Sequence, residues 1–229
     1  MKLARPDIRH PRIVLVGSQD GDDAGLVAAL RKRGLHARWL SWDDPDTLRA
    51  DLVILRTITD YGDRLEEFLT WTKRASNLLN GADVVAWNAG QRYLRDLRHA
   101  GVPVRNRRAA AAAVRTALVY LGGRQSHAFD TAAASPVEAD FELWDLGQAA
   151  LQAVADQLNI GAHELLYARA DVIGGPGHAE LVGLDLVAPS LGWRLLDDAA
   201  RDDGQRQFAL CVESALDRLG LGPLSQRRP

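Results

Sequence analysis

The stretch Arg12-Ile13-Val14-Leu15-Val16-Gly17 sets the fold class of this chain. It is a short apolar run that ends in a glycine, which is typical of a buried strand. An acidic turn follows. A helix is predicted next, with Leu26, Val27 and Leu30 on one face and Gly34 placed to end it. A strand that leads through a turn into a helix is the first unit of an α/β protein.

The alternation of strand and helix patterns continues to about residue 103. In chain order the patterns predict strands over 36–42 and 51–55, a helix over 62–76, a strand over 84–87, and a helix that Asn88 caps and Gly101 and Pro103 end. Strands that alternate with helices predict a parallel sheet with helices on its faces.

The second half has an antiparallel pattern. Two glycine-rich turns, Gly122-Gly123-Arg124 and Gly174-Gly175-Pro176-Gly177, each separate two strand patterns, which predicts two hairpins. The predicted elements are strands over 116–121, 125–129, 165–173 and 180–187, a linker over 131–142, and helices marked by Leu146 to Leu158 and by Phe208 to Leu219. This change of pattern predicts a domain boundary near residue 104, with domains over 1–104 and 105–219 and a flexible tail over 220–229.

Composition excludes several classes of protein. The 229 residues have a net charge of −2 with both signs interspersed, so no basic face for nucleic acid is expected. No apolar run approaches the roughly 18 residues of a membrane span, and residues 1–11 contain no hydrophobic signal region. The single cysteine, Cys211, excludes an internal disulfide. These features predict a globular protein of the cytoplasm with no membrane or nucleic-acid partner.

Several stretches in collinear order resemble the ATP-grasp superfamily of carboxylate–amine ligases, which includes the glutathione synthetase-like and D-alanine–D-alanine ligase-like enzymes. They are residues 51–61, 67–71, 79–80, 84–88, 92–104, 116–128, 166–172 and 184–191. The resemblance covers most of the chain outside 105–115 and the tail. It implies an N-terminal parallel α/β domain of the pre-ATP-grasp kind, followed by a shortened α+β domain with an antiparallel sheet.

The resemblance also implies a chemistry. In this family a substrate carboxylate attacks the γ-phosphate of ATP, and an amine or thiol then displaces phosphate from the acyl phosphate. Magnesium ions held by carboxylates bridge the phosphates, and lysines neutralise them. ATP and Mg²⁺ are therefore the expected cofactors if the chain is an active ligase.

The chain departs from this family pattern at the nucleotide site. Where relatives have an Asp-Lys pair near the start of a helix, this chain has Gly90 and Gln91. Relatives place several tens of residues, including a phosphate flap, where this chain has only 105–115. Eleven residues are too few for a strand pair and a lid. Gln91 and Arg115 are left as the candidates for nucleotide contact.

Two aspartates are the candidate metal ligands. The resemblance places Asp171 at a ligand position and Asp185 where a glutamate is usual. On neighbouring antiparallel strands both carboxylates reach one metal only if they share a face. A shift of one residue in register decides this, and the glycine-rich turn leaves the register open.

The candidate substrate-binding residues are Arg56, Asp60, Tyr61, Arg169 and Ser190. Arg56 follows a predicted parallel strand, at the edge where α/β sheets bind ligands. It is expected either to bind a substrate carboxylate or to fix the loop structurally. Asp60 and Tyr61 are also expected to start the next helix. Arg169 and Asp171 are expected to form an ion pair within one strand, and Ser126 beside His127 is a weak nucleophile pattern.

Three functions fit the sequence. The first is a degenerate ATP-grasp protein that binds a small molecule or peptide or supports an active ATP-grasp partner. The second is an active ATP- and Mg²⁺-dependent carboxylate–amine ligase in which Arg105, Arg107, Arg108 and Arg115 replace lysines. The third is a scaffold whose exposed sheet edge is covered by a partner or a second copy.

Overall fold

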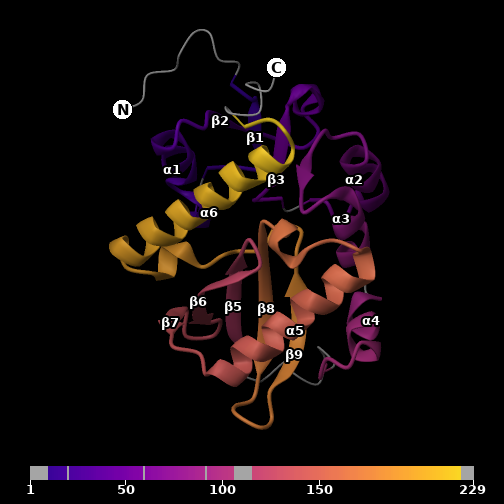
Figure 1. Cartoon of the computed structure of the whole chain (residues 1–229), viewed down its shortest axis with the longest axis vertical. Helices are drawn as coiled ribbons and strands as arrows, with labels where there is room; N and C mark the ends of the chain where they lie inside the picture. Colours follow the sequence, from indigo (N-terminus) through magenta and orange to yellow (C-terminus); the bar gives the residue numbers. More distant parts are fainter. Residues whose placement is uncertain (1–9, 20, 59, 91, 106–114, 223–229) are drawn as a thin grey trace.

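The computed structural model describes residues 10–19, 21–58, 60–90, 92–105 and 115–222. These residues form two sheets, one parallel and one antiparallel, with helices packed on their faces. Figure 1 shows the parallel sheet above and the antiparallel sheet below. The predicted α/β fold class is confirmed.

The parallel sheet has the strand order β2-β1-β3-β4. Its strands are β1 (Ile13–Val16), β2 (Ala37–Leu40), β3 (Leu52–Leu55) and β4 (Leu78–Leu79). Every residue of the two central strands, β1 and β3, is buried, because helices cover both faces of the sheet. The helices of this half are α1 (Leu26–Lys32), α2 (Leu65–Thr72), α3 (Ala82–Ala89) and α4 (Tyr93–His99), with short 3-10 turns η1 (Gly21–Asp23) and η2 (Pro45–Arg49).

The predictions for residues 84–88 are wrong. The apolar run at 84–87 lies in α3 and is not a strand, and the two-residue strand β4 lies just before it. Asn88 is inside α3 and does not cap α4. A short apolar run fits a buried helix as well as a strand. Here Val84 and Val85 of α3 are both buried, Val84 in the cluster with Leu118 and Val85 in the cluster with Phe68.

The antiparallel sheet has the order β7-β6-β5-β8-β9. Its strands are β5 (Thr116–Leu121), β6 (Arg124–Asp130), β7 (Ser135–Val137), β8 (Tyr167–Ile173) and β9 (Glu180–Asp185). Both predicted hairpins are present, but β7 lies within the predicted linker. The short strand adds to β6, with Ala128 opposite Val137.

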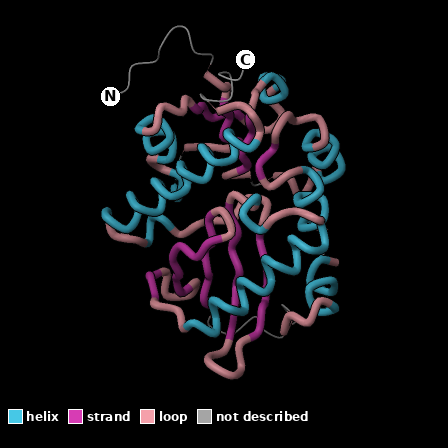
Figure 2. Tube along the Cα trace, viewed as in Figure 1, coloured by secondary structure: helices cyan, strands magenta, loops and turns pink. Residues whose placement is uncertain are grey.

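Two long helices cover opposite faces of this sheet. Side chains of β5 and β8 alternate between the faces, so Leu118 and Ala170 pack with α5 (Phe141–Leu158), while Val119 and Tyr167 pack toward α6 (Asp198–Arg218). Figure 2 shows α5 lying along the antiparallel sheet and α6 crossing between the two sheets. Two further 3-10 turns are η3 (Ala162–Glu164) and η4 (Trp193–Leu195).

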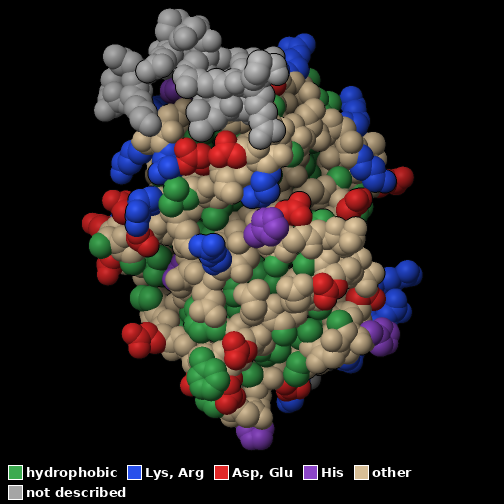
Figure 3. All heavy atoms as spheres, viewed as in Figure 1, with side chains coloured by type: hydrophobic (Ala, Val, Ile, Leu, Met, Phe, Trp, Pro, Cys, Tyr) green, Lys and Arg blue, Asp and Glu red, His purple; other side chains and the backbone are tan. Residues whose placement is uncertain are grey.

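One hydrophobic cluster joins the sheets. It contains Ile13 and Leu15 of β1, Val119 of β5, Tyr167 of β8 and Phe208 of α6. The boundary expected near residue 104 stays a prediction. Acidic and basic side chains are interspersed on the face that Figure 3 shows. Within the described ranges no helix has both the length and the apolar character needed to cross a bilayer.

Candidate functional site

Arg56 lies directly after β3 and is enclosed by protein. Its side chain is 1% exposed, and its Nε donates to Asp23 Oδ1 (3.0 Å) while Nη2 donates to the Pro189 carbonyl (2.9 Å). The guanidinium also lies over the rings of Tyr167 and Trp193, at 5.0 and 5.7 Å from their centroids. These contacts favour the structural interpretation of Arg56. Its role in binding substrate stays a prediction.

The acidic turn η1 fixes the loop that follows β9. Asp22 accepts hydrogen bonds from Ser190 Oγ (3.1 Å), Gly192 N (2.8 Å) and Arg194 N (3.1 Å). Its neighbour Asp23 accepts from Arg56 and from Thr57 Oγ1 (2.7 Å). The sequence showed an acidic turn here, but nothing in it indicated that the partners lie about 170 residues away.

Asp60 and Tyr61 lie in the turn before α2. Asp60 accepts from Trp42 Nε1 (3.1 Å) and lies 3.5 Å from an Arg64 nitrogen, and the Tyr61 ring packs against Phe68 at 5.2 Å between centroids. These contacts are made on the α2 side of the parallel sheet. They agree with the expectation that both residues lead into the next helix.

The register of β8 and β9 places three charged side chains on one face. Arg169 lies opposite Asp185, and Asp171 lies opposite Gly183. Because opposite residues and residues two apart share a face, Arg169, Asp171 and Asp185 point to the same side. Arg169 forms two bonds to Asp171, from Nε to Oδ1 (2.8 Å) and from Nη2 to Oδ2 (3.3 Å). The expected ion pair within the strand is therefore present.

Neighbouring groups complete this face. The Arg169 guanidinium lies over the Phe129 ring, at 5.1 Å from its centroid, and Nη1 is 3.4 Å from the Ser190 carbonyl. Burial is the largest influence on Asp185 and raises its pKa, against the opposing effects of the Val187 backbone N–H and of Arg169. When a carboxyl has a higher pKa in the folded state than in the unfolded state, its ionisation destabilises the folded protein. Ionised Asp185 therefore lowers the stability of the fold at neutral pH.

His127 lies between a serine and a backbone carbonyl. Ser126 Oγ is 3.0 Å from Nδ1, and the Leu191 carbonyl is 2.5 Å from Nε2. A neutral ring with its proton on Nε2 satisfies both contacts, since Nε2–H donates to Leu191 and Nδ1 accepts from Ser126. Burial, the largest influence, lowers the pKa of His127.

This lowered pKa predicts a loss of stability in acid. As the pH falls below about 6.5, His127 takes up a proton in the unfolded chain before it does so in the folded chain. Protonation therefore stabilises the unfolded chain, and the protein loses stability until the pH reaches the pKa of His127 in the folded state. We expect the free energy of unfolding to fall by less than about 1.4 kcal/mol per pH unit from this group. We expect urea unfolding at several pH values between 5 and 7.5 to show that the free energy of unfolding changes less steeply with pH in His127→Gln than in the unsubstituted chain. Ser126→Ala keeps the ring and should keep the slope. Equal slopes in His127→Gln and the unsubstituted chain would contradict the assignment.

Sequence comparison relates the N-terminal half to one family. The model of the D-cycloserine synthetase DcsG N-terminal domain matches residues 8–80. The cycloserine biosynthesis protein DcsG of Streptomyces lavendulae is 34% identical over 90 residues, which cover 37% of this chain and 30% of DcsG. The aligned part thus spans less than a third of that relative.

Comparison of structures covers nearly the whole chain. The crystal structure of D-cycloserine synthetase DcsG matches with a TM-score of 0.74 and 21% identity, over 91% of this chain and 99% of that one. D-alanine–D-alanine ligase of Bacillus anthracis, complexed with ATP, matches with a TM-score of 0.58 and 12% identity, over 96% and 99%. The ATP-grasp ligase PsnB matches with a TM-score of 0.57 and 13% identity, over 90% and 100%.

This chain has the fold that these ATP-grasp ligases share. The resemblance drawn from its sequence is therefore confirmed.

The described residues do not fit the magnesium ions of ATP-grasp chemistry. Mg²⁺ needs carboxylate oxygens that are open to it. Both oxygens of Asp171 are bonded to Arg169, and Asp185 Oδ1 accepts from Val187 N (3.0 Å). A metal would have to displace a guanidinium whose charge it also repels. Among the described residues no group of three metal-ligating side chains occurs.

The candidate nucleotide contacts of the ATP-grasp pattern are mostly outside the structure. Gln91, Arg107 and Arg108 lie outside the described residues. Arg115 lies directly before β5, and its carbonyl accepts from Thr131 N (2.9 Å). Arg105 forms an ion pair with Glu180 (2.7 Å). Asp60 lies apart, on the α2 side of the parallel sheet. Arg56 and Arg169 reach the carbonyls of two neighbouring residues, Pro189 and Ser190, in the loop after β9.

Proposed function

We propose that this chain is an ATP-grasp-fold protein of a biosynthetic pathway that acts as a binding or accessory subunit and does not form an acyl phosphate. The biosynthetic setting rests on similarity to DcsG, a cycloserine biosynthesis protein. The loss of ligation rests on one observation: Arg169 occupies both oxygens of Asp171 on the face where the two candidate metal ligands lie.

The physical argument concerns charge. Phosphoryl transfer from ATP depends on positioning and on neutralising the phosphates with metal ions and cations. Asp171 is already paired with a cation from its own strand, because Arg169 Nε lies 2.8 Å from Asp171 Oδ1. The shared face of β8 and β9 therefore provides a neutral ion pair and one buried carboxyl, Asp185, where the chemistry needs free metal ligands.

The proposal predicts weak binding of nucleotide. Titration calorimetry of the full chain with ATP and Mg²⁺ should show no binding tighter than about 1 mM, which corresponds to about −4 kcal/mol. No ADP should be released with a panel of amino acids as carboxylate and amine substrates. Arg169→Ala exposes Asp171 and should raise Mg²⁺ affinity, whereas Arg124→Ala, on β6, should not.

A micromolar dissociation constant for Mg-ATP, or ADP release that depends on an amino acid, would overturn this proposal. That outcome would establish instead the active carboxylate–amine ligase in which arginines replace lysines. Its cofactors would then be ATP and Mg²⁺.

A partner belongs to the same proposal. Val137 at the end of β7 and Phe141 at the start of α5 are 36% and 69% exposed, which is unusual for large apolar side chains. They lie near the β7 edge of the antiparallel sheet. The candidates are a small molecule or peptide as ligand, and a second copy or an active ATP-grasp enzyme as partner.

A further inference from the structure

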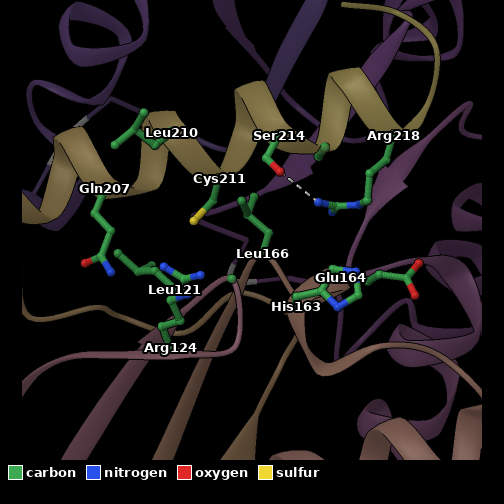
Figure 4. A pocket seen from close by; sticks show the side chains of 12 residues that line it. Leu121, Arg124, His163, Glu164, Leu166, Gln207, Leu210, Cys211, Ser214 and Arg218 are labelled. Atoms are coloured by element: carbon green, nitrogen blue, oxygen red, sulfur yellow. Dashed lines mark hydrogen bonds between the residues drawn. The ribbon is translucent and has the colours of Figure 1, made fainter.

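A pocket of about 430 Å³ lies between the β5–β6 turn, the turn η3 and the helix α6. Figure 4 shows it from close by, with Cys211 pointing from α6 toward the hairpin. Its lining residues are not those of the Arg169–Asp171 face. The inference below therefore goes beyond the proposed function and does not depend on it.

Two arginines line this pocket without acidic partners. Among the described residues, the Arg124 guanidinium forms no hydrogen bond or ion pair, and the Arg218 guanidinium donates only from Nη1 to Ser214 Oγ (3.1 Å). By contrast, Arg201 and Arg206 of the same helix are each paired with an aspartate three residues earlier. Among the described residues, neither of these guanidinium groups is therefore paired with a carboxylate.

The acid that lines the pocket does not neutralise them. Glu164 Oε1 accepts from Gly161 N (2.7 Å), and Figure 4 shows the Glu164 carboxylate pointing away from the centre of the pocket. Cys211 adds no negative charge, because burial raises the pKa of its thiol although Arg124 and Arg218 oppose that shift. Arg124 comes from β6 and Arg218 from α6, and both side chains line the same pocket.

The rest of the lining combines the polar side chains of His163 and Gln207 with an apolar wall. Leu121 and Leu166 are buried, and Leu210 is 40% exposed at the rim. A cavity of this size with a few convergent polar groups on an apolar wall has the usual form of a small-molecule site. Guanidinium groups bind carboxylates through paired, charge-assisted hydrogen bonds.

We propose that this pocket binds a small organic carboxylate. The carboxylate lies between Arg124 and Arg218, where Ser214 Oγ is a further donor. The apolar part of the ligand lies against Leu121, Leu166 and Leu210.

Cys211 is the only cysteine of the chain, so its alkylation reports on this pocket alone. We compare the rate of alkylation of Cys211 by iodoacetate, which is charged, with the rate by iodoacetamide, which is neutral. The ratio of the first rate to the second should fall about threefold in Arg124→Gln and about threefold in Arg218→Gln. A threefold change is what removing one positive charge about 6 Å from the reagent's carboxylate would cause in a medium close to water. The ratio cancels any change in thiol reactivity. Arg206→Gln, on the same helix, should leave it unchanged.

The same thiol tests binding. At pH 8.5, 4-methylpentanoate should slow alkylation by iodoacetamide in the unsubstituted chain but not in Arg124→Gln or Arg218→Gln, and the amide of that acid should not protect. Thermal unfolding of each variant shows whether it is folded. Equal protection by the acid and its amide, or none by either, would overturn the proposal. Stronger protection by inorganic phosphate would overturn the carboxylate assignment.

Discussion

Replacing Arg56 with alanine is expected to lower the free energy of unfolding by about 3–5 kcal/mol. The substitution leaves the carboxylate of Asp23, which is 3% exposed, without its cation in the interior. Its other partner is the hydroxyl of Thr57, at 2.7 Å, and this neutral donor does not offset a buried charge. The Pro189 carbonyl also loses its donor. Urea unfolding of the two proteins gives the difference.

An exposed ion pair serves as the matched control. Arg12 also pairs with an aspartate, Asp51, but its side chain is 60% exposed. Arg12→Ala should therefore cost much less stability than Arg56→Ala. If Arg56→Ala is as stable as Arg12→Ala and instead abolishes binding of a ligand, the substrate-binding role of Arg56 replaces the structural one.

Arg56 also shows what the sequence could predict. The sequence predicted that Arg56 follows a parallel strand, because the apolar run before it is a local pattern of residues adjacent in the chain. Its burial depends on Asp23 and Pro189, which are 33 and 133 residues away, and on a loop fixed by Asp22. Local patterns indicate where a side chain starts, but distant contacts decide what surrounds it.

The same limit explains the errors at residues 84–88 and the open register of β8 and β9. The length of an apolar run is the main sign that separates a strand from a buried helix, and the run at 84–87 is too short to decide. The register of β8 and β9 shifts between Asp171 and Val172, so counting residues back from the glycine-rich turn gives the wrong partners. The face shared by Asp171 and Asp185 therefore had to come from the structure.

Asn80 was not among the predicted site residues, yet it joins the two halves of the fold. Its Nδ2 donates to the carbonyls of Tyr167 (2.8 Å) and Leu186 (2.7 Å), and its Oδ1 accepts from Leu166 N (2.8 Å). The side chain follows β4 of the parallel sheet and reaches both β8 and the end of β9. Asn88 binds the other side of Leu186, accepting from its N–H at 2.8 Å. Two asparagines thus fix the start of the loop that leads to Ser190.

We expect Asn80→Ala to lower the free energy of unfolding by about 3–5 kcal/mol. Three buried backbone groups lose their partner, at about 1–3 kcal/mol each. Alanine also has to adopt the left-handed backbone of this position, where φ is +57°. Asn77→Ala is the matched control, because Asn77 has a φ of +48° but donates only to the exposed Asp51 carbonyl (2.9 Å). Urea unfolding should separate the two variants by at least about 2 kcal/mol. Equal losses in both would show that the backbone conformation, and not the bonds to Leu166, accounts for the effect.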